Sequence, residues 1–269
     1  MKIVIGTNTF GKYDRQDIAV ESWKHLSNIY GCDVIDVQFV DQNELHYDID
    51  TRSVLTRSSR DVIECDKQLP FVNDILNVLA TEEHDYFIYV NSDVILTNSI
   101  IKRVINEQPD CFACSRVDIQ PVSTFQQIVD KQVKPIRYEI AGFDAFVFKT
   151  EWFRANSHMF NDYFVGQPCW DQVYATIMRV FGGSNFANQL PPCCFHVKHD
   201  PTWQLDSNSP EQKFNHKSVE INPVDRIAFK MFDNYLRGVL IRRKQPGLFM
   251  TPVTNEQQIE QQYFGDYLT

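Results

Sequence analysis

One buried strand that ends in a polar, acidic step constrains the fold of this chain more than any other feature. Residues 85–96 read Asp-Tyr-Phe-Ile-Tyr-Val-Asn-Ser-Asp-Val-Ile-Leu, so apolar, β-forming side chains surround Asn91-Ser92-Asp93. A continuous apolar run of this length is typical of a strand that is covered on both faces. An acid at the end of such a strand is typical of nucleotide and metal sites in α/β sheets, although the same three residues also favour an ordinary turn.

The first forty residues predict a parallel start to that sheet. Residues 3–5 form a short apolar strand, residues 16–30 carry apolar side chains at helical spacing, and Gly31 ends the helix. A second apolar strand follows over 34–40 and ends at Asp41. This strand–helix–strand order predicts parallel strands that are joined by a right-handed crossover.

The remaining pattern alternates helices and strands without a clear linker. We expect helices over about 70–79, 100–106, 151–156, 170–181 and 223–243, and strands over 86–90, 111–117, 141–148 and 193–197. We expect a polar segment over 48–66, an irregular and partly polar loop over 118–140, and a long polar loop over 200–222. The predicted fold class is α/β, with a mixed, mainly parallel sheet flanked by helices and a C-terminal helical extension. Residues 1–222 would form the main domain, in halves of about 1–117 and 118–222, and residues 223–269 a helix and tail packed on it.

Composition and charge narrow the function classes. The chain has 269 residues, of which 43% are hydrophobic and 13% aromatic, so it can build a substantial core and shows no signature of disorder. Its net charge of −9 argues against a nucleic-acid partner, because phosphate-backbone binding needs a surplus of Lys and Arg. Seven cysteines, no secretory leader and no bilayer-spanning apolar stretch predict a cytoplasmic protein with reduced thiols.

Polar segments follow the predicted strands in the order of a known enzyme family. The first strand is followed by Thr7-Asn8-Thr9-Phe10, the second ends at Asp41, and the central strand ends in Asn91-Ser92-Asp93. Over roughly residues 1–200 this order resembles the GT-A fold glycosyltransferases, particularly the bacterial family-2 type, with Asn91 in place of the first acid of their Asp-x-Asp element. The resemblance implies transfer of a sugar from a nucleotide-diphosphate donor, by default a UDP-sugar, to a hydroxyl acceptor such as a growing glycan or a lipid-linked acceptor.

The resemblance also implies roles for individual residues. In that family the turn after the first strand and the acid ending the second strand hold the nucleobase, and the first residue of the acidic step contacts the ribose. Arg15 would approach the base or the diphosphate, and Asp74, before the central strand, would contact the donor. The implied donor-binding residues are Thr7, Asn8, Thr9, Phe10, Arg15, Asp41, Asp74, Asn91 and Ser92. For each of them taken alone, a turn, a strand end or a solvated helix face is the simpler interpretation.

Asp93 and two late histidines are the implied metal ligands. Asp93 supplies the hard oxygen that Mg²⁺ or Mn²⁺ prefers, and the resemblance adds a C-terminal histidine, His199 as first choice and His196 as second. The cation would stabilise the departing diphosphate. Together with Cys193 and Cys194 the two histidines also suit a zinc site by composition, but adjacent cysteines are poor tetrahedral chelators. A strand-end histidine that is satisfied by a backbone partner is a further alternative.

Two acids compete for the catalytic role. Asp171 follows Trp170 at the start of a predicted helix, where the resemblance implies an acid that deprotonates the acceptor hydroxyl for single displacement with inversion. An ordinary helix-start residue is the alternative. Asp144 lies in a run of aromatic and small residues and is better suited to bind acceptor or donor-sugar hydroxyls. If Asp171 is not the base, a retaining mechanism stays open.

Further alternatives concern the position of the C-terminal segment and the function class of the protein. Residues 226–244 are locally basic and allow an amphipathic helix, which could rest on the inner face of a membrane or pack on the core. A nucleotidyltransferase has a similar sheet but usually carries a Gly-rich loop near the N-terminus, for which Gly6-Thr7-Asn8-Thr9-Phe10-Gly11 is a weak substitute. A non-catalytic sugar-binding or scaffold protein would show no nucleotide affinity.

Overall fold

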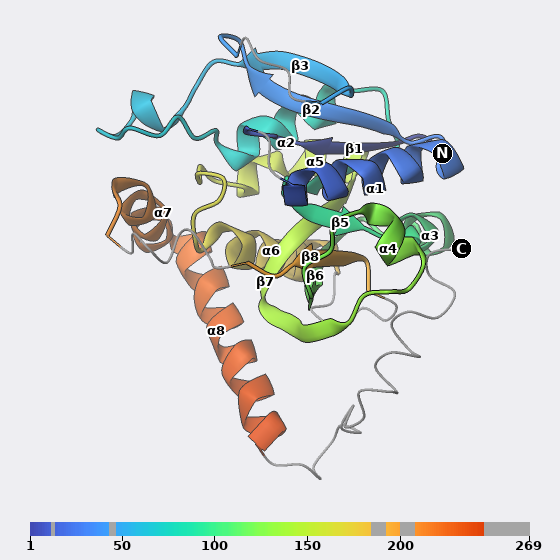
Figure 1. Ribbon diagram of the computed structural model, residues 1–269. Coiled ribbons are helices and arrows are strands. Elements are labelled where there is room, and N and C mark those ends of the chain that lie inside the picture. Colours follow the sequence, from blue (N-terminus) through green and yellow to red (C-terminus); the bar gives the residue numbers. More distant parts are fainter. Residues whose placement is uncertain (12–13, 43–46, 184–191, 200–207, 245–269) are drawn as a thin grey trace.

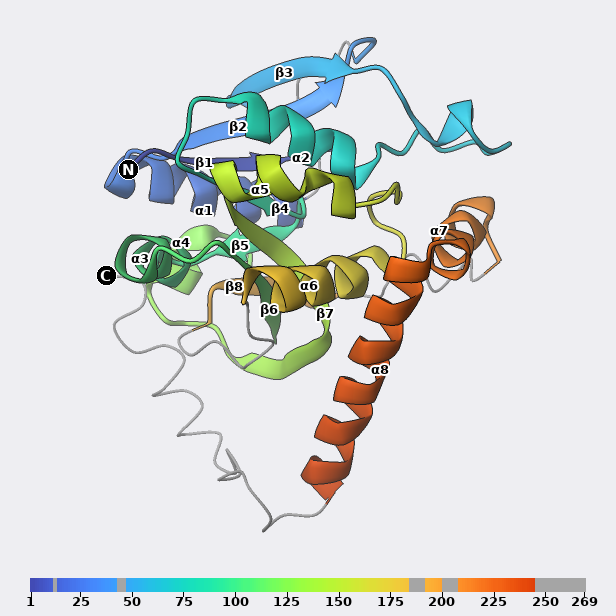
Figure 2. The ribbon, with the colours of Figure 1, turned by 180° about the vertical axis from the view of Figure 1, so that it is seen from behind.

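The centre of the molecule is one sheet of eight strands, shown from opposite sides in Figures 1 and 2. The computed structural model describes residues 1–11, 14–42, 47–183, 192–199 and 208–244. The strand order is β3-β2-β1-β4-β7-β6-β8-β5. The strands are β1 (Ile3–Thr7), β2 (Asp33–Phe39), β3 (Asp50–Leu55), β4 (Tyr86–Val90), β5 (Val94–Leu96), β6 (Cys111–Ile119), β7 (Pro135–Lys149) and β8 (Cys194–Val197).

The sheet is parallel in its N-terminal part and mixed beyond it. β1 pairs in parallel with β2 and β4, and β2 pairs in parallel with β3. β7 runs antiparallel to its neighbours β4 and β6, β8 is parallel to β6, and β5 is antiparallel to β8. This arrangement confirms the predicted α/β class with a mixed, mainly parallel sheet. Because β1, β2 and β4 run in the same direction, the residues that follow them meet at one edge.

Helices cover both faces of the sheet (Figures 1 and 2). One face carries α1 (Asp14–Tyr30), α3 (Asn98–Glu107) and α4 (Phe125–Val129). The other carries α2 (Val72–Thr81), α5 (Thr150–Asn156) and α6 (Trp170–Gly182). The C-terminal extension consists of α7 (Pro210–Ile221) and α8 (Pro223–Lys244), and short 3₁₀ turns occupy Ser59–Asp61 and Ser157–Met159.

Side-chain alternation along the strands divides the apolar core into two layers. In β4, Ile88 belongs to the layer that contains Trp23 of α1, whereas Phe87 belongs to the layer that contains Val173 of α6. All four side chains are fully buried. Burying a side chain of this size contributes about 1.5–3 kcal/mol, so β4 is held firmly from both faces.

Three segments for which no helix or strand is predicted contain regular structure. β3 lies within 48–66, α4 and the first part of β7 lie within 118–140, and α7 lies within 200–222, of which 200–207 fall outside the described residues. β3 is rich in polar residues and mostly exposed, so it lacks an apolar pattern. The buried face of α7 includes Gln212 and Asn215, and Asn215 hydrogen-bonds the backbone of Phe164 in both directions. A polar buried face hides the helical period from sequence analysis.

β6 and β7 extend past the end of β4 as an antiparallel pair, and β8 pairs with the other side of β6 over Val117–Ile119. We call this pair of segments, Ser115–Ile119 with Pro135–Phe143, the β6–β7 ribbon. β4 pairs only with the later part of β7, from Ala145 to Lys149. At the far end of the ribbon, α4 packs on α1, where the Phe125 N–H donates to Glu21 over 3.3 Å and the Phe125 ring meets His25 edge-on. The ribbon is therefore fixed at both the sheet and α1.

α8 is attached to the α6 side of the domain. Asp225 is fully buried and accepts hydrogen bonds from Asn161 and Tyr163, and the buried Phe232 lies in the α2–α6 core layer. Ile227 remains 58% exposed. The side chains of 238–244 and all of 245–269 lie outside the described residues, so membrane contact through 226–244 stays a prediction. No helix among the described residues is both long and apolar enough to cross a membrane.

Gly6 allows α2 to approach β1 closely. A methyl group added at Gly6 would lie 2.8 Å from Leu79 Cγ and closer still to its two methyl groups, so Leu79 would have to move. We expect Gly6→Ala to lower the free energy of unfolding by about 1–3 kcal/mol, as measured by urea denaturation. Gly142→Ala in β7 is the matched control, because its added methyl group meets nothing closer than 3.5 Å. Equal destabilisation by both substitutions would contradict this explanation.

Candidate metal and donor site

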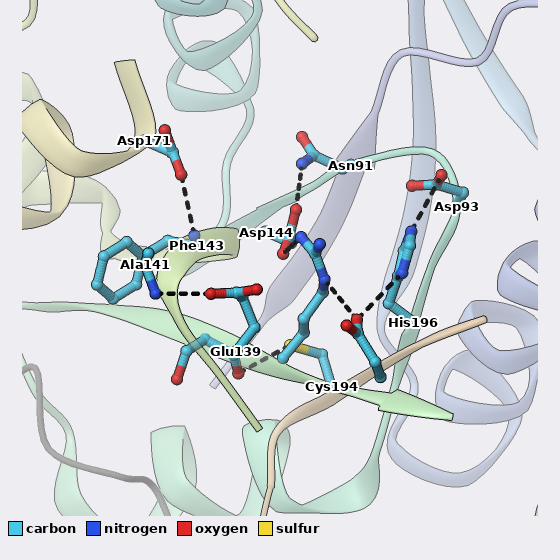
Figure 3. Close-up of polar contacts among 12 residues, drawn as sticks. Asn91, Asp93, Glu139, Ala141, Phe143, Asp144, Asp171, Cys194 and His196 are labelled. Carbon is cyan, nitrogen blue, oxygen red and sulfur yellow. Dashed lines mark hydrogen bonds and ion pairs between the residues drawn. The ribbon is translucent and has the colours of Figure 1, made fainter. Parts of the chain in front are cut away.

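The carboxyl end of β4 brings Asp93 together with two histidines. Asp93 follows β4 in a tight turn, His196 lies on β8, and His199 comes shortly after it. His199 Nε2 lies 3.3 Å and His196 Nε2 3.5 Å from Asp93 Oδ2, and the two Nε2 atoms are 3.1 Å apart. The structure thus places all three predicted metal ligands in one cluster, in which the ligand atoms lie within 4.8 Å of one another. Figure 3 shows Asp93 and His196 pointing toward each other.

The strand pairing explains how the buried His196 is oriented. His196 is opposite Val94 of β5 on one side and opposite Asp118 of β6 on the other. Its Nε2 faces Asp93, and its Nδ1 lies 3.4 Å from Asp118 Oδ1. Burial opposes a charge on His196, but the adjacent carboxylates of Asp118 and Asp93 outweigh it and raise the pKa of His196 to about 9. Burial also raises the pKa of Asp93, but both histidines overcome this effect and hold it well below its usual range.

The donor set fits a divalent cation. One carboxylate oxygen and two imidazole nitrogens are ligands that Mn²⁺ and other divalent transition metals accept. The Asp118 carboxylate behind His196 is the kind of partner that orients a metal-bound histidine. A cation would have to displace the proton that His196 carries, since a ligating imidazole is neutral. The predicted zinc alternative does not fit, because Cys193 and Cys194 are both buried and Cys194 Sγ faces the Ser115 carbonyl oxygen.

Arg15 lies beside the same cluster. Its Nε is 3.3 Å from Asp93 Oδ2, and its side chain is about one-third exposed. Arg15 therefore stands where a guanidinium could contact a diphosphate next to the cation. The structure places this predicted donor residue beside Asp93, the first of the predicted metal ligands.

A second buried polar cluster forms where β1 and β2 end. Thr9 N donates to Asp36 Oδ1 over 2.9 Å, the Thr9 hydroxyl donates to Asp36 Oδ2, and Gln38 Nε2 donates to the Thr9 carbonyl oxygen over 2.6 Å. Asn8 Nδ2 donates to the Val37 carbonyl oxygen over 2.6 Å. Asp36 is 4% exposed. We call Asn8, Thr9, Asp36 and Gln38 the β1–β2 corner.

The remaining predicted donor residues have separate surroundings. Thr7 is buried and donates to the Val90 carbonyl oxygen over 2.9 Å, whereas Phe10 is 52% exposed. Asp41 is exposed in the turn after β2, which ends at Phe39 rather than at Asp41 as predicted. Asp74 binds Arg57 in a two-point ion pair with distances of 2.8 and 3.0 Å. Arg57 also binds Asp162, so Asp74 belongs to an ion-pair cluster of its own.

Asn91 and Asp144 bind each other across β4 and β7. Asn91 Nδ2 donates to Asp144 Oδ1 over 2.8 Å, and Asn91 N donates to the Asp144 carbonyl oxygen over 3.0 Å (Figure 3). Arg116 Nη1 donates to Asp144 Oδ2 over 2.6 Å. Both carboxylate oxygens of Asp144 are thus bound by protein groups. Ser92 is buried between Asn91 and the metal cluster.

Asp171 lies in the first turn of α6, on the other side of Asn91 and Asp144 from Asp93 (Figure 3). Its Oδ2 accepts a hydrogen bond from Phe143 N over 3.1 Å. Burial raises the pKa of Asp171 to about 7, helped by the nearby charge of Asp144, although hydrogen bonds from backbone N–H groups oppose the shift. A carboxylate with a pKa near 7 is suited to accept a proton at neutral pH.

Comparison with known proteins identifies the fold. No family model and no curated protein sequence matches this chain. The structure is similar to that of residues 1–349 of TarS from S. aureus, a GT-A-type glycosyltransferase, in complex with UDP-GlcNAc, with a TM-score of 0.50 at 12% identity. The likeness covers 97% of this chain and 78% of that chain. A second structure of the same TarS segment gives a TM-score of 0.45 at 11% identity. That likeness covers 97% of this chain and 77% of that chain. The first likeness confirms the GT-A-like fold.

Sequence analysis missed four site residues that lie inside strands. Asp36 and Gln38 interrupt the apolar run of β2, and Arg116 and Asp118 stand two residues apart in the apolar run of β6. Acids within a strand that is otherwise apolar are rarely buried without a partner. Charged residues at i and i+2 of a strand share one face, so this spacing was a readable signal.

Proposed function

We propose that this chain is a glycosyltransferase that moves a sugar from a nucleotide-diphosphate donor, by preference a UDP-sugar, to a hydroxyl group of a glycan or lipid-linked acceptor. The observation that carries the proposal is the Asp93–His196–His199 cluster at the strand-end edge of the sheet. The fold resembles that of TarS, whose crystal structure contains UDP-GlcNAc. The β1–β2 corner near the ends of β1 and β2, and Asp171 beside Phe143 of β7, support a donor site next to an acceptor site.

On the donor side, this chain would bind the nucleotide and hold the diphosphate. Asp93, His196 and His199 would bind the cation, and Arg15 would bind a diphosphate oxygen. A bound Mn²⁺ or Mg²⁺ would neutralise the negative charge that develops on the departing diphosphate. The β1–β2 corner would contact the nucleobase, and Asn91, held by Asp144, would reach the ribose.

On the acceptor side, Asp171 would act as the general base. It takes the proton of the acceptor hydroxyl while that oxygen bonds to the anomeric carbon of the donor sugar. The bond between the anomeric carbon and the phosphate oxygen breaks, and its electron pair leaves with the nucleoside diphosphate. One base and direct attack opposite the leaving group give inversion at the anomeric carbon.

Product analysis tests the proposal against the two alternatives. The full chain is incubated with UDP-, GDP- and CMP-sugars and Mn²⁺ with a panel of glycan acceptors, and binding of each donor is measured by calorimetry. A glycosyltransferase releases the nucleoside diphosphate, or the monophosphate from a CMP-sugar. A nucleotidyltransferase instead consumes a nucleoside triphosphate and a sugar phosphate and releases pyrophosphate. If the folded protein binds none of the donors, with or without Mn²⁺, the proposal fails and a scaffold role is favoured.

Asp36 and Asp41 are rival candidates for the acid that serves the nucleobase. Asp36 fixes Thr9 and Gln38 in the β1–β2 corner, whereas Asp41 lies exposed in the following turn. We expect Asp36→Asn to weaken UDP binding about tenfold or more, because a charge-assisted hydrogen bond is worth about 1.5–3 kcal/mol. We expect Asp41→Asn to leave the Kd unchanged. The opposite ranking in calorimetry would reinstate Asp41 as the residue that contacts the base.

A further inference from the structure

An ion-pair chain runs behind the metal cluster toward the acceptor side. Arg116 Nε binds Asp118 Oδ1 at 2.9 Å, and Arg116 Nη1 binds Asp144 Oδ2 at 2.6 Å. Asp118 in turn lies 3.4 Å from the Nδ1 atom of His196. These contacts link the residues one to the next in the order Asp93, His196, Asp118, Arg116, Asp144 and Asn91.

The middle of this ion-pair series lies in strands rather than in loops, with Arg116 and Asp118 in β6, Asp144 in β7 and His196 in β8. Arg116 and Asp118 share one face of β6 in the β6–β7 ribbon, and Asp118 is paired directly opposite His196 of β8. The Asp118 side chain is only 4% exposed. Burying a carboxylate costs several kcal/mol unless charged partners surround it, and Arg116 and Arg137 both bind this one. They hold the pKa of Asp118 well below its usual range, with His196, against the opposing effect of burial.

We propose that Asp118, fixed by Arg116, is a positioning residue for the divalent-cation site, and that Arg116 ties this site to Asp144 at the acceptor side. Asp118 would fix the ring of His196 so that its Nε2 faces the cation. Arg116 would keep Asp118 and Asp144 at a constant separation, because one planar guanidinium binds both. This inference rests on the metal site of the proposed function.

Metal affinity tests the inference independently of catalysis. The full chain is titrated with Mn²⁺, and free Mn²⁺ is followed by electron paramagnetic resonance. We expect Asp118→Asn to raise the Kd for Mn²⁺ about tenfold and Asp118→Ala by up to about a hundredfold, as for other carboxylates that orient a metal-bound histidine. Asp118→Asn keeps the shape and one acceptor oxygen, so it decides the question if the alanine variant does not fold.

Arg137 provides the matched control. Its Nε also binds Asp118, at 2.8 Å, but its side chain is 60% exposed at the edge of the ribbon. Arg137→Gln should change the Kd by less than about twofold, because exposed ion pairs contribute little. Arg116→Gln, which breaks the link to Asp144, should weaken Mn²⁺ binding as much as Asp118→Asn does.

The outcomes separate this inference from the proposed function. If the wild type binds Mn²⁺ and folded Asp118→Asn binds it equally well, Asp118 has a structural role only and the inference is wrong. Equal losses in Arg137→Gln and Asp118→Asn would also overturn it, since any change of charge would then suffice. If the wild type binds no Mn²⁺ at millimolar concentration, the metal site itself fails and the inference falls with it.

Discussion

Asp171→Asn is expected to lower kcat for sugar transfer about 10²–10⁴-fold, because in the proposed mechanism the acceptor hydroxyl loses its general base. The amide can still accept the hydrogen bond from Phe143 N, so the start of α6 should keep its geometry. In the wild type, kcat/KM should rise with pH and level off above about pH 7, where Asp171 is ionised. Initial rates between pH 5 and 9 measure this profile, with Asp85→Asn at the opposite end of β4 as the control.

The same substitution should stabilise the protein at neutral pH. The pKa of Asp171 rises from 3.8 to about 7 on folding, so the folded state favours the protonated acid. Stability is therefore unaffected below pH 3.8 and is lost progressively as the pH rises from 3.8 to about 7. Asp171→Asn removes this cost and should raise the free energy of unfolding at pH 8 by roughly 1–3 kcal/mol. A variant that is both less active and no more stable at pH 8 would contradict a base whose pKa is raised on folding.

Asp93→Asn is expected to abolish Mn²⁺ binding at micromolar concentration and to reduce sugar transfer about 10³-fold or more. The carboxylate is the only charged ligand in the cluster of Asp93, His196 and His199 among the described residues. Its loss removes the charge that offsets the cation and also frees Arg15 and both histidines from their shared partner. Mn²⁺ affinity, donor affinity and initial rates are measured together.

Chelation distinguishes a metal role from a purely structural role of Asp93. Treatment of the wild type with EDTA should reproduce the loss of donor affinity, and added Mn²⁺ should restore it, because metal-free protein keeps the Asp93–His196 ion pair. Asp93→Asn should not respond to Mn²⁺. Full activity of the wild type in EDTA would show that transfer proceeds without a cation, and Arg15 would then be the main partner of the diphosphate.

The sequence predicted those parts of the site that lie at the ends of apolar strands. Asn91, Asp93 and His196 stand out because each follows or ends a run of buried residues. Asp171 stands out because it opens a helix with a clear apolar period. In these places the local pattern and the family resemblance together selected residues that the structure brings close together.

Other parts depend on contacts that no local pattern records. Asp36 and Asp118 are inside strands, and each has a partner that is distant in the sequence: Thr9, after β1, for Asp36, and His196 of β8 for Asp118. α7 was predicted as a loop because its buried residues are polar, although Ser209 caps it and Pro210 opens it in the usual way. Because sequence analysis relies on the periodicity of apolar residues, it did not find the buried polar groups of this site.

The β6–β7 ribbon, which is fixed at both the sheet and α1, connects α1 to the residues behind Asp93. The Phe143 end of the ribbon leads into the part of β7 that pairs with β4, and β8 pairs with Val117–Ile119 toward the other end. Beyond that end, Phe125 of α4 contacts Glu21 and His25 on α1. A movement of α1 would therefore be transmitted through α4 to β6 and β8, the strands that carry Asp118 and His196, and would change the geometry behind Asp93.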